Sequence, residues 1–317
     1  MYLICGEALF DIFQLDDQDN TESVRLNAYA GGSPFNVAIG IARLGGQASL
    51  MTGISTDALG RKLISILERE SVGLDYLLRS GRRTTLSLVN LDSEGSPEYA
   101  FYGQDSADTA IEPDQLPGLG AEIEGIHFGS YSLVVKPVAD AFEALLKANS
   151  DRFISLDPNV RPTIEADMVA WRVRIERYSS YADLIKISRE DIEYLYPGVN
   201  HQEKINEWLG RGVSLVVITD GGKGCAAWTG SGLHLKMPVL KSNVIDTVGA
   251  GDSFQAALLA KLGEAGNLKQ AVRALDQSGL QSLIDYAIAA ASITCSRRGA
   301  DLPTKQVVQS SLDERLG

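Results

Sequence analysis

A glycine-rich stretch that ends in a carboxylate is the part of this sequence best suited to chemistry. Residues 246–252 read Asp246-Thr247-Val248-Gly249-Ala250-Gly251-Asp252, and the apolar run 253–262 follows at once. The glycines allow a tight turn and let a ligand approach the backbone without meeting a Cβ. If a helix starts here, its first N–H groups lack intrahelical partners and can bind an anion. Asp252 suits a base that takes a proton from a hydroxyl attacking a phosphoryl group, although Asp is also typical of a helix N-terminus.

Two expected strands, at 183–187 and 214–219, lead into polar or glycine-rich residues. The second strand is followed by a Gly-x-Gly pattern, but residues 225–237 read as a β-hairpin and not as the helix that a dinucleotide fingerprint needs. We therefore exclude NAD binding. A Walker A motif is excluded as well, because Gly224 follows Lys223 where Ser or Thr is required. Two interpretations stay open: a strand end that touches nucleotide phosphates, or a plain hairpin turn.

Other polar residues also have a structural and a functional interpretation. The spacing of Ser188 and Asp191 by itself favours a helix capping box, and the alternative places their oxygens near a hydrated Mg²⁺. Arg161 offers a planar fork to a phosphate or sugar oxygen, or else forms a surface salt bridge. Glu7, Asp11 and Asn36 lie beside or within apolar runs, where buried carboxylates and amides need partners such as sugar hydroxyls. We expect structural roles for the three histidines, which are His127, His201 and His234.

The composition excludes several functional classes. The 317 residues are 44% hydrophobic and 22% charged, which is ordinary for a globular protein. The formal net charge of −12 repels nucleic acid and anionic membranes, so we expect neither as a partner. Three widely spaced cysteines argue against a disulfide framework and suit a reducing cytosol. Because we see no basic leader and no apolar run long enough to span a bilayer, we expect a soluble, cytoplasmic protein.

The elements that must position these residues alternate between strands and helices. Strands are expected at 2–6, 48–54, 124–128, 153–156, 183–187 and 214–219. Helices are expected at 35–44, 57–69, 136–149, 165–180, 189–195, 201–210, 250–263, 267–277 and 279–297, with a loose tail after them. This alternation predicts a mostly parallel sheet covered by helices on both faces, with ligands at the carboxyl ends of the strands.

Two β-rich segments interrupt the alternation. Residues 9–29 contain an acidic turn at 16–20, and residues 82–104 contain two β-rich runs on either side of a turn at 92–97. Neither segment contains a helical pattern, so each reads as a hairpin. We expect the two to form a small sheet that acts as a lid inserted into a single domain over 1–317.

Taken together, these pieces resemble the ribokinase-like carbohydrate kinases of the PfkB family, and within them the bacterial fructokinases. The two motifs that carry the resemblance are residues 246–252 and Gly31-Gly32-Ser33-Pro34-Phe35-Asn36-Val37-Ala38, with Leu44-Gly45 after it. The resemblance covers nearly the whole chain, including 157–161 and 295–300. It implies a three-layer α/β/α sandwich with a β lid, ATP–Mg²⁺ as the phosphoryl donor and a free sugar as the acceptor.

The resemblance also implies a role for each matching residue. Asp252 would be the general base, and the backbone N–H groups of Gly249, Ala250 and Gly251 would form an anion hole. The sugar-binding positions would be Asp11, Gly31, Gly32, Asn36, Tyr102 and Arg161. The ATP site would be lined by Lys186, Ser188, Thr219, Gly221 and Gly224. Asp246 and Thr247, with backbone near Arg298 and Gly299, match a site for a monovalent cation such as K⁺, and Asp191 would reach Mg²⁺ through a water.

Two departures from the family pattern bear on the metal and the substrate. Many relatives carry Asn-x-x-Glu where this chain has Ser188-Arg189-Glu190-Asp191. Relatives that phosphorylate 2-keto-3-deoxygluconate place an arginine after paired tyrosines, where this chain has Phe101-Tyr102-Gly103. Loss of that arginine favours a neutral sugar, fructose first, with 2-keto-3-deoxygluconate, ribose or a nucleoside as alternatives.

Two further possibilities concern function and assembly. A non-catalytic sugar or nucleotide sensor is the alternative from another class, and the intact run 249–252 argues against it. An apolar face on the lid would favour a homodimer in which two lids pack together.

Overall fold

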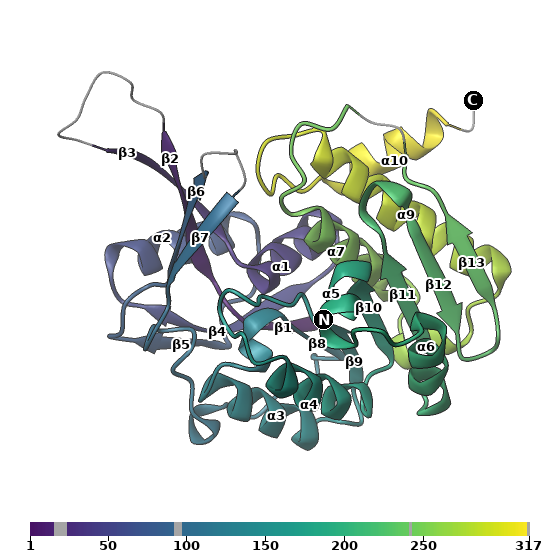
Figure 1. The fold of residues 1–317 in the computed structure, drawn as a ribbon, viewed down its shortest axis with the longest axis horizontal. Coiled ribbons are helices and arrows are strands. Elements are labelled where there is room, and N and C mark those ends of the chain that lie inside the picture. The colour runs from purple at the N-terminus through teal and green to yellow at the C-terminus, as the bar shows by residue number, and fades with distance from the viewer. Residues whose placement is uncertain (16–23, 92–96, 241–242, 316–317) are drawn as a thin grey trace.

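A nine-stranded sheet forms the centre of the described chain, which comprises residues 1–15, 24–91, 97–240 and 243–315 of the computed structural model (Figure 1). Its strands are β1 (Tyr2–Cys5), β4 (Ala48–Ser55), β5 (Leu77–Ser80), β8 (Gly125–Gly129), β9 (Phe153–Asp157), β10 (Leu184–Ser188), β11 (Leu215–Thr219), β12 (Cys225–Thr229) and β13 (His234–Met237). They lie in the order β13-β12-β11-β10-β9-β8-β1-β4-β5. Every neighbouring pair is parallel except β11–β12 and β12–β13, which confirms the mostly parallel sheet.

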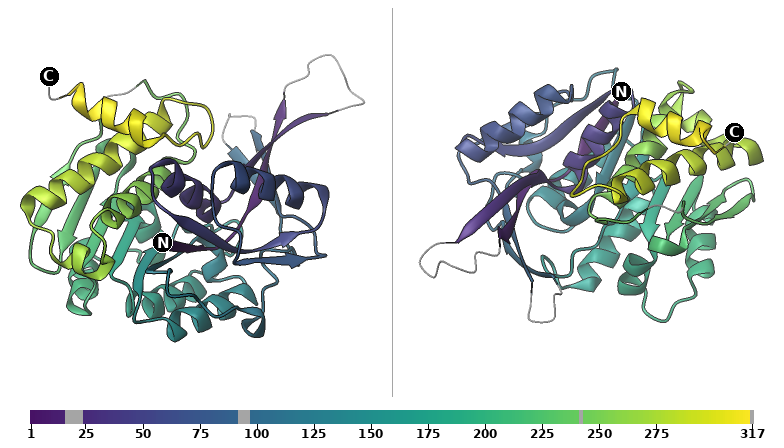
Figure 2. Two further views of the ribbon diagram at one scale, coloured as in Figure 1. Left: turned by 180° about the vertical axis from the view of Figure 1, so that it is seen from behind. Right: turned by 90° about the horizontal axis from the view of Figure 1, so that it is seen from above.

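Helices cover both faces of this sheet (Figures 1 and 2). One face packs against α1 (Ser33–Arg43), α2 (Ala58–Arg69), α7 (Ala250–Gly263), α8 (Leu268–Arg273) and α9 (Gln277–Cys295). The other packs against α3 (Val138–Ala148), α4 (Met168–Ser179), α5 (Arg189–Leu195) and α6 (His201–Gly210). Short 3₁₀ helices span Pro113–Gln115, Ser130–Leu133 and Gly221–Lys223. Among the described helices, none is long and apolar enough to cross a bilayer.

The side chains of the first strand, β1, pack into two hydrophobic cores, one on each face of the sheet. Tyr2 and Ile4 belong to the core beneath α1, α7 and α9, whereas Leu3 and Cys5 belong to the core beneath α3 and α4. Successive side chains of a strand point to opposite faces, so a strand buried on both sides must be apolar throughout. The sandwich therefore has three layers, as expected.

A second sheet of four strands stands away from the large one (Figures 1 and 2). Its strands are β2 (Leu9–Leu15), β3 (Arg25–Gly31), β6 (Leu86–Leu91) and β7 (Pro97–Tyr102), in the order β3-β2-β6-β7. Each predicted hairpin is an antiparallel pair, and β2 and β6 join the two hairpins in parallel. The turns expected at 16–20 and 92–97 fall on residues outside the described ones, except for Pro97 at the start of β7.

The base of the small sheet is tied to the large domain by two carboxylates, the half-buried Asp57 and the buried Asp108. Asp57 caps α2 by accepting the Gly60 N–H at 2.7 Å, and it also accepts the Thr84 hydroxyl at 2.7 Å. Asp108 accepts hydrogen bonds from the hydroxyls of Thr85 and Tyr131. Because Thr84 and Thr85 directly precede β6, these contacts fix where the small sheet leaves the domain.

Three parts of the chain differ from expectation. The tail that we expected to be loose forms α10 (Lys305–Asp313), which packs on α9 through the fully buried Val308 and binds Glu264 through Lys305. The helix predicted at 267–277 ends at Arg273, because Asp276 caps a new helix by accepting the Gly279 N–H. Strand β5 was not expected, since its half-buried residues at the sheet edge show no clear alternation.

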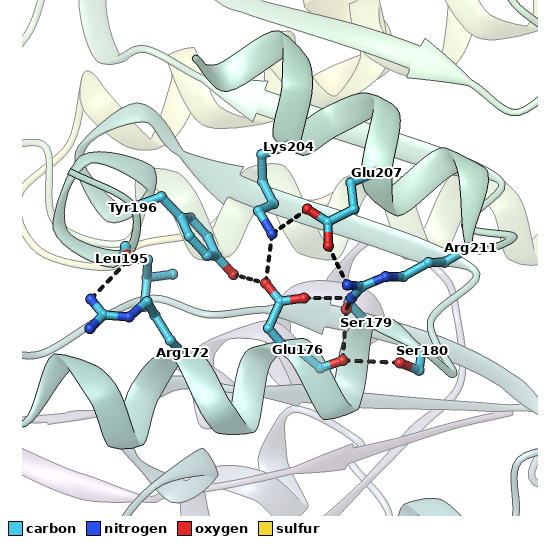
Figure 3. Close-up of polar contacts among 9 residues, drawn as sticks. All are labelled: Arg172, Glu176, Ser179, Ser180, Leu195, Tyr196, Lys204, Glu207 and Arg211. Atoms are coloured by element: carbon cyan, nitrogen blue, oxygen red, sulfur yellow. Dashed lines mark hydrogen bonds and ion pairs between the residues drawn. The ribbon is translucent and has the colours of Figure 1, made fainter. Parts of the chain in front are cut away.

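A network of charges joins α4 and α6 on the surface (Figure 3). The carboxylate of Glu176 accepts hydrogen bonds from the Tyr196 hydroxyl at 2.5 Å, from Lys204 Nζ at 2.9 Å and from Arg211. Burial acts to raise the pKa of Glu176, but these hydrogen bonds outweigh it and hold the pKa below its ordinary value. Lys204 is nearly buried and also lies 4.4 Å from the centre of the Tyr196 ring.

We expect Glu176→Gln to lower the free energy of unfolding by about 1–2 kcal/mol at pH 7, because Lys204 then loses one of its two carboxylates. A carboxylate with a lowered pKa stabilises the fold above its ordinary pKa and loses that contribution as the pH falls. The difference between variant and wild type should therefore shrink below about pH 4 in urea unfolding curves. Glu193→Gln, at an exposed glutamate of α5, is the control; an equal loss there would contradict the network's role.

Candidate active site

Helix α7 begins at the glycine-rich turn, as predicted. Its N-cap is Gly249, whose φ of 77° is left-handed. A Cβ on this glycine would lie 2.6 Å from the Ala300 side chain, so both the conformation and the space require glycine. The Ser253 N–H donates to the Gly249 carbonyl at 2.8 Å, which closes the first turn.

The backbone N–H groups of this turn are only partly engaged. Ala250 donates its N–H to the Thr247 carbonyl at 3.2 Å. In the part of the chain that the structure describes, the N–H groups of Gly249 and Gly251 find no acceptor. Two of the three predicted anion-hole donors are thus open to a ligand, and the third would have to be shared.

The Asp252 carboxylate is held by the start of α1. Its Oδ1 accepts the Ser33 hydroxyl at 2.7 Å, and its Oδ2 accepts Asn36 Nδ2 at 2.8 Å. Asn36, expected to meet a sugar, has this carboxylate as its partner. Ser33 was not singled out by its sequence, because a serine beside a proline at a helix start is unremarkable by itself. The two contacts fix the orientation of Asp252, as a positioned base requires.

Asp11 and the two glycines before α1 lie together at the junction of the two sheets. A Cβ on Gly31 would be 2.6 Å from Asp11 Oδ2, and one on Gly32 would be 2.7 Å from the Glu7 carbonyl oxygen. Glu7, expected to need a partner such as a sugar hydroxyl, accepts the Ser33 N–H through Oε1 at 3.2 Å. The glycines therefore let the start of α1 approach the Asp11 carboxylate and the Glu7 backbone closely.

Electrostatic coupling links Asp11 to Arg161 and Asp252. Burial raises the pKa of Asp11, the Ser87 hydroxyl and Arg161 lower it, and Asp252 raises it. Burial likewise raises the pKa of Glu7 to about 8, with Arg161 among the groups that oppose the shift. Arg161 is exposed and forms no ion pair with a described residue, so the surface salt bridge is not seen. Its positive charge acts on the carboxyl groups of both Asp11 and Glu7.

Tyr102 is the predicted sugar-site residue that the structure leaves apart. It ends β7 opposite Leu86 in the small sheet, and its side chain is 63% exposed. No hydrogen bond joins it to Asp11 or Asp252 within the described residues.

The five predicted ATP-site residues lie in β10, at the end of β11 and in the turn that follows β11. Ser188 and Thr219 are register partners in these strands. Gly221 and Gly224 both have positive φ, and a Cβ on Gly224 would be 2.0 Å from the Met237 carbonyl oxygen. The hairpin β12–β13 follows where a dinucleotide fold would need a helix. Lys186 lies within β10, and its Nζ donates to Asp157 Oδ2 of β9 at 2.7 Å.

Ser188 and Asp191 form the predicted capping box. Ser188 Oγ accepts the Asp191 N–H at 2.9 Å, and Asp191 Oδ2 accepts the Ser188 N–H at 3.4 Å. Asp191 Oδ1 also accepts the Val160 N–H at 2.9 Å. Both carboxylate oxygens are engaged with backbone, so a Mg²⁺-bound water would have to share them.

Two acidic residues bear on metal binding. Asp157 Oδ1 is buried without a hydrogen-bond partner among the described residues, which suits an acceptor for a metal-bound water. Asp246 accepts the Gly299 N–H through Oδ2 at 2.8 Å and the Val248 N–H through Oδ1 at 3.0 Å. The two segments expected to form the monovalent-cation site therefore adjoin each other. Within the described chain no cluster of three His, Cys, Asp or Glu side chains could hold a metal by itself.

Each histidine has a contact that explains its position. His127 is fully buried beside Ser155 Oγ, and burial, followed by the charge of Lys186, lowers its pKa to about 3. His201 contacts Arg189, and His234 stacks on Trp228. None of the three contacts Asp252.

Comparison with known proteins places this chain in a family. The profile of the pfkB family of carbohydrate kinases matches residues 2–306. A fructokinase of Rhizobium leguminosarum bv. trifolii is 37% identical over 89% of this chain and 86% of its own length. Probable fructokinase-6 of Arabidopsis thaliana is 32% identical over 98% of this chain and 82% of its own.

Two solved structures share the fold over nearly the whole chain. The ATP-bound fructokinase of Xylella fastidiosa superimposes with a TM-score of 0.89 at 24% identity, covering 99% of this chain and 98% of that one. A fructokinase of Vibrio cholerae O395, solved with fructose, ADP and calcium, superimposes with a TM-score of 0.82 at 25% identity. It covers 98% of this chain and 97% of its own.

Proposed function

The chain belongs to the pfkB family of carbohydrate kinases and is thus a phosphotransferase acting on a sugar hydroxyl, and we propose that it transfers the γ-phosphoryl group of ATP to fructose. One observation carries the assignment of the reacting centre. Asp252 is held by Ser33 and Asn36 in the first turn of α7, directly after two backbone N–H groups that are open to an anion.

In the proposed reaction, Asp252 takes the proton of the attacking hydroxyl while that oxygen forms a bond to the γ-phosphorus. The bond from the γ-phosphorus to the β–γ bridging oxygen breaks, and its electron pair leaves with ADP. Open N–H groups at Gly249 and Gly251 stabilise the charge on the transferring group. Closure of the small sheet as a lid would exclude water as a competing acceptor.

We further propose Mg²⁺ as the metal of the nucleotide and K⁺ at the site by Asp246. Asp157 Oδ1, and Asp191 by sharing an oxygen, would accept hydrogen bonds from water bound to Mg²⁺, which usually keeps several waters in nucleotide sites. When bound, Mg²⁺ neutralises part of the polyphosphate charge. Asp246 and Thr247 lie three and two residues before Gly249, so a cation there would stabilise the turn that carries the open N–H groups.

Fructose is the proposed acceptor for two reasons. The curated relatives are named fructokinases or probable fructokinases. Position 103 also lacks the arginine that would meet a sugar-acid carboxylate, and a Cβ on Gly103 would lie 2.2 Å from the Phe101 ring. A neutral sugar therefore fits this lid better than 2-keto-3-deoxygluconate does.

The test is ADP release from ATP and Mg²⁺ with fructose, ribose, 2-keto-3-deoxygluconate, glucose and a nucleoside. We expect turnover with fructose to be at least tenfold faster than with any other acceptor in this set. Faster turnover with 2-keto-3-deoxygluconate would show that fructose is not the preferred acceptor, although the protein would still be a carbohydrate kinase. Binding of sugar and nucleotide without turnover, in metal-replete protein, would favour the sensor.

We expect Asp11→Asn to raise the KM for the sugar by about 10- to 100-fold, because a charged hydrogen-bond acceptor is worth roughly 1.5–3 kcal/mol. The KM for ATP should stay within about threefold of wild type, since Asp11 lies with Gly31 and not with the ATP strand ends. Initial rates over a grid of both substrates measure the two constants. A rise in the KM for ATP alone would contradict the placement of Asp11 in the sugar site.

We also propose a homodimer that packs through the small sheet, and a cytoplasmic location. Leu26, Tyr29 and Tyr102 are exposed apolar side chains on that sheet, and a partner's lid would cover them. Light scattering would measure the mass of the protein in solution, and a mass of two chains is expected. The three cysteines are free thiols, which suits the reducing cytosol.

A further inference from the structure

Lys186 is a buried cation in an arrangement that stability does not explain. Its side chain is 5% exposed, and its partner Asp157 is 1% exposed at the end of the neighbouring strand. The ammonium donates to Asp157 Oδ2 at 2.7 Å. Removing two charges from water costs more than their attraction often returns, so a buried pair adds little to stability. The buried charge of Lys186 therefore suggests a role other than stabilising the fold.

The ammonium lies against the glycine turn of α7. A Cβ built on Gly251 would be 3.2 Å from Lys186 Nζ, so the glycine allows this approach. An ammonium carries three N–H donors, and only the one to Asp157 has an acceptor among the described residues. The Gly251 N–H is also unpartnered there. Open donors from a side chain and from the backbone thus adjoin at one point.

The buried polar side chains of β8 and of the start of α7 are neutral. His127 has a lowered pKa and carries no charge at neutral pH. Ser253 Oγ and Gln255 Oε1 are buried without partners in the described chain, which suits a buried water there. These neutral groups cannot provide the positive charge that a transferring phosphoryl group needs, whereas Lys186 can.

We propose that Lys186 is a catalytic residue that binds the transferring phosphoryl group beside Gly251, and that Asp157 positions its ammonium. This inference rests on the proposed kinase reaction. As the sugar oxygen bonds to the γ-phosphorus and the bond to the ADP oxygen breaks, charge on the equatorial oxygens faces the free donors of Lys186. Asp252 takes the sugar proton, so Lys186 keeps its own throughout. Asp157 holds the ammonium at the turn and prevents it from folding into the polar interior.

The main test compares Lys186→Met with wild type. We expect kcat to fall by about 10³-fold, as when a preorganised donor is removed from a charged transition state, with the KM for ATP changed less than threefold. Calorimetry should show ADP bound as in wild type and ADP with fluoroaluminate, a mimic of the transferring group, bound about 100-fold more weakly. The Mg²⁺ concentration for half-maximal rate should stay unchanged.

Two further variants separate catalysis from folding. Lys186→Met with Asp157→Asn leaves no unpaired buried charge, and we expect it to fold and to show the same loss of kcat. At saturating Mg²⁺, where its contact to metal-bound water does not limit the rate, Asp157→Asn alone should lower kcat about tenfold and cause no additional loss in the Lys186→Met background. Lys204→Met removes another nearly buried, paired lysine on α6 and should keep wild-type kcat.

Three outcomes would overturn the inference. Equal weakening of ADP and ADP with fluoroaluminate would make Lys186 a nucleotide-lining residue only. A kcat within threefold of wild type would make the pair structural. Additive effects of the two substitutions would remove the positioning role of Asp157. The rates are measured with the sugar that the wild-type protein turns over fastest, and the binding of ADP with fluoroaluminate needs no sugar. A wrong assignment of fructose would therefore leave the test of Lys186 unaffected.

Discussion

Replacing Asp252 with asparagine is expected to lower kcat by about 10³-fold, within the 10²–10⁴ range of general bases. Asparagine keeps the shape of the side chain and can still bond to both Ser33 and Asn36, because the serine hydroxyl donates or accepts. The fold and both KM values should therefore change little. Only the capacity to take the proton is lost. Steady-state rates over both substrates, with urea unfolding of the same preparations, measure the effect.

The control for Asp252→Asn is Asp276→Asn, which alters another aspartate at a helix start. Asp276 caps α9 by accepting the Gly279 N–H at 2.7 Å and has no part in the site. Its loss should reduce stability slightly and leave kcat unchanged. If Asp252→Asn kept kcat within threefold of wild type while folding normally, another group would have to be the base.

The sequence predicted the large sheet because its strands are unusually easy to recognise. Residues 214–219 are apolar on both faces, and β11 is indeed buried by helices on both sides. The start of α7 at Ala250 was predictable too, since Gly249 marks the left-handed N-cap by its type alone. Local chemistry and burial were sufficient at these places.

Contacts between distant residues could not be predicted in the same way. Ser33 and Asp252 are 219 residues apart, and nothing in either neighbourhood specifies the other. The pairing of Lys186 with Asp157 depends on β9 and β10 lying side by side, which alternation of strands and helices does not establish. Helix α10 was missed for a related reason. Its stability comes from packing Val308 on α9, and the mostly polar sequence of the tail does not reveal this contact.

Gly249→Ala is expected to lower kcat by about 100-fold, because it displaces the turn that carries both the open N–H groups and Asp252. Two effects combine at this residue. A φ of 77° costs a non-glycine residue roughly 1–2 kcal/mol. The added methyl group would also lie 2.6 Å from the Ala300 Cβ, so the turn or the segment at 300 must move. We expect the KM values to change less than kcat, since Asp11 and the ATP strand ends are not attached to this turn.

The two effects can be separated with Gly212→Ala. Gly212 has a φ of 106°, and a Cβ there would meet nothing within 4 Å. This variant should lose stability through backbone strain alone and keep wild-type kcat in the same assay. Gly249→Ala should lose both stability and kcat, because the clash with Ala300 displaces the turn that carries the open N–H groups and Asp252. If the two variants lost equal stability and both kept full kcat, the position of the glycine turn would not control phosphoryl transfer, and the anion hole would have to be sought at the ends of β10 and β11.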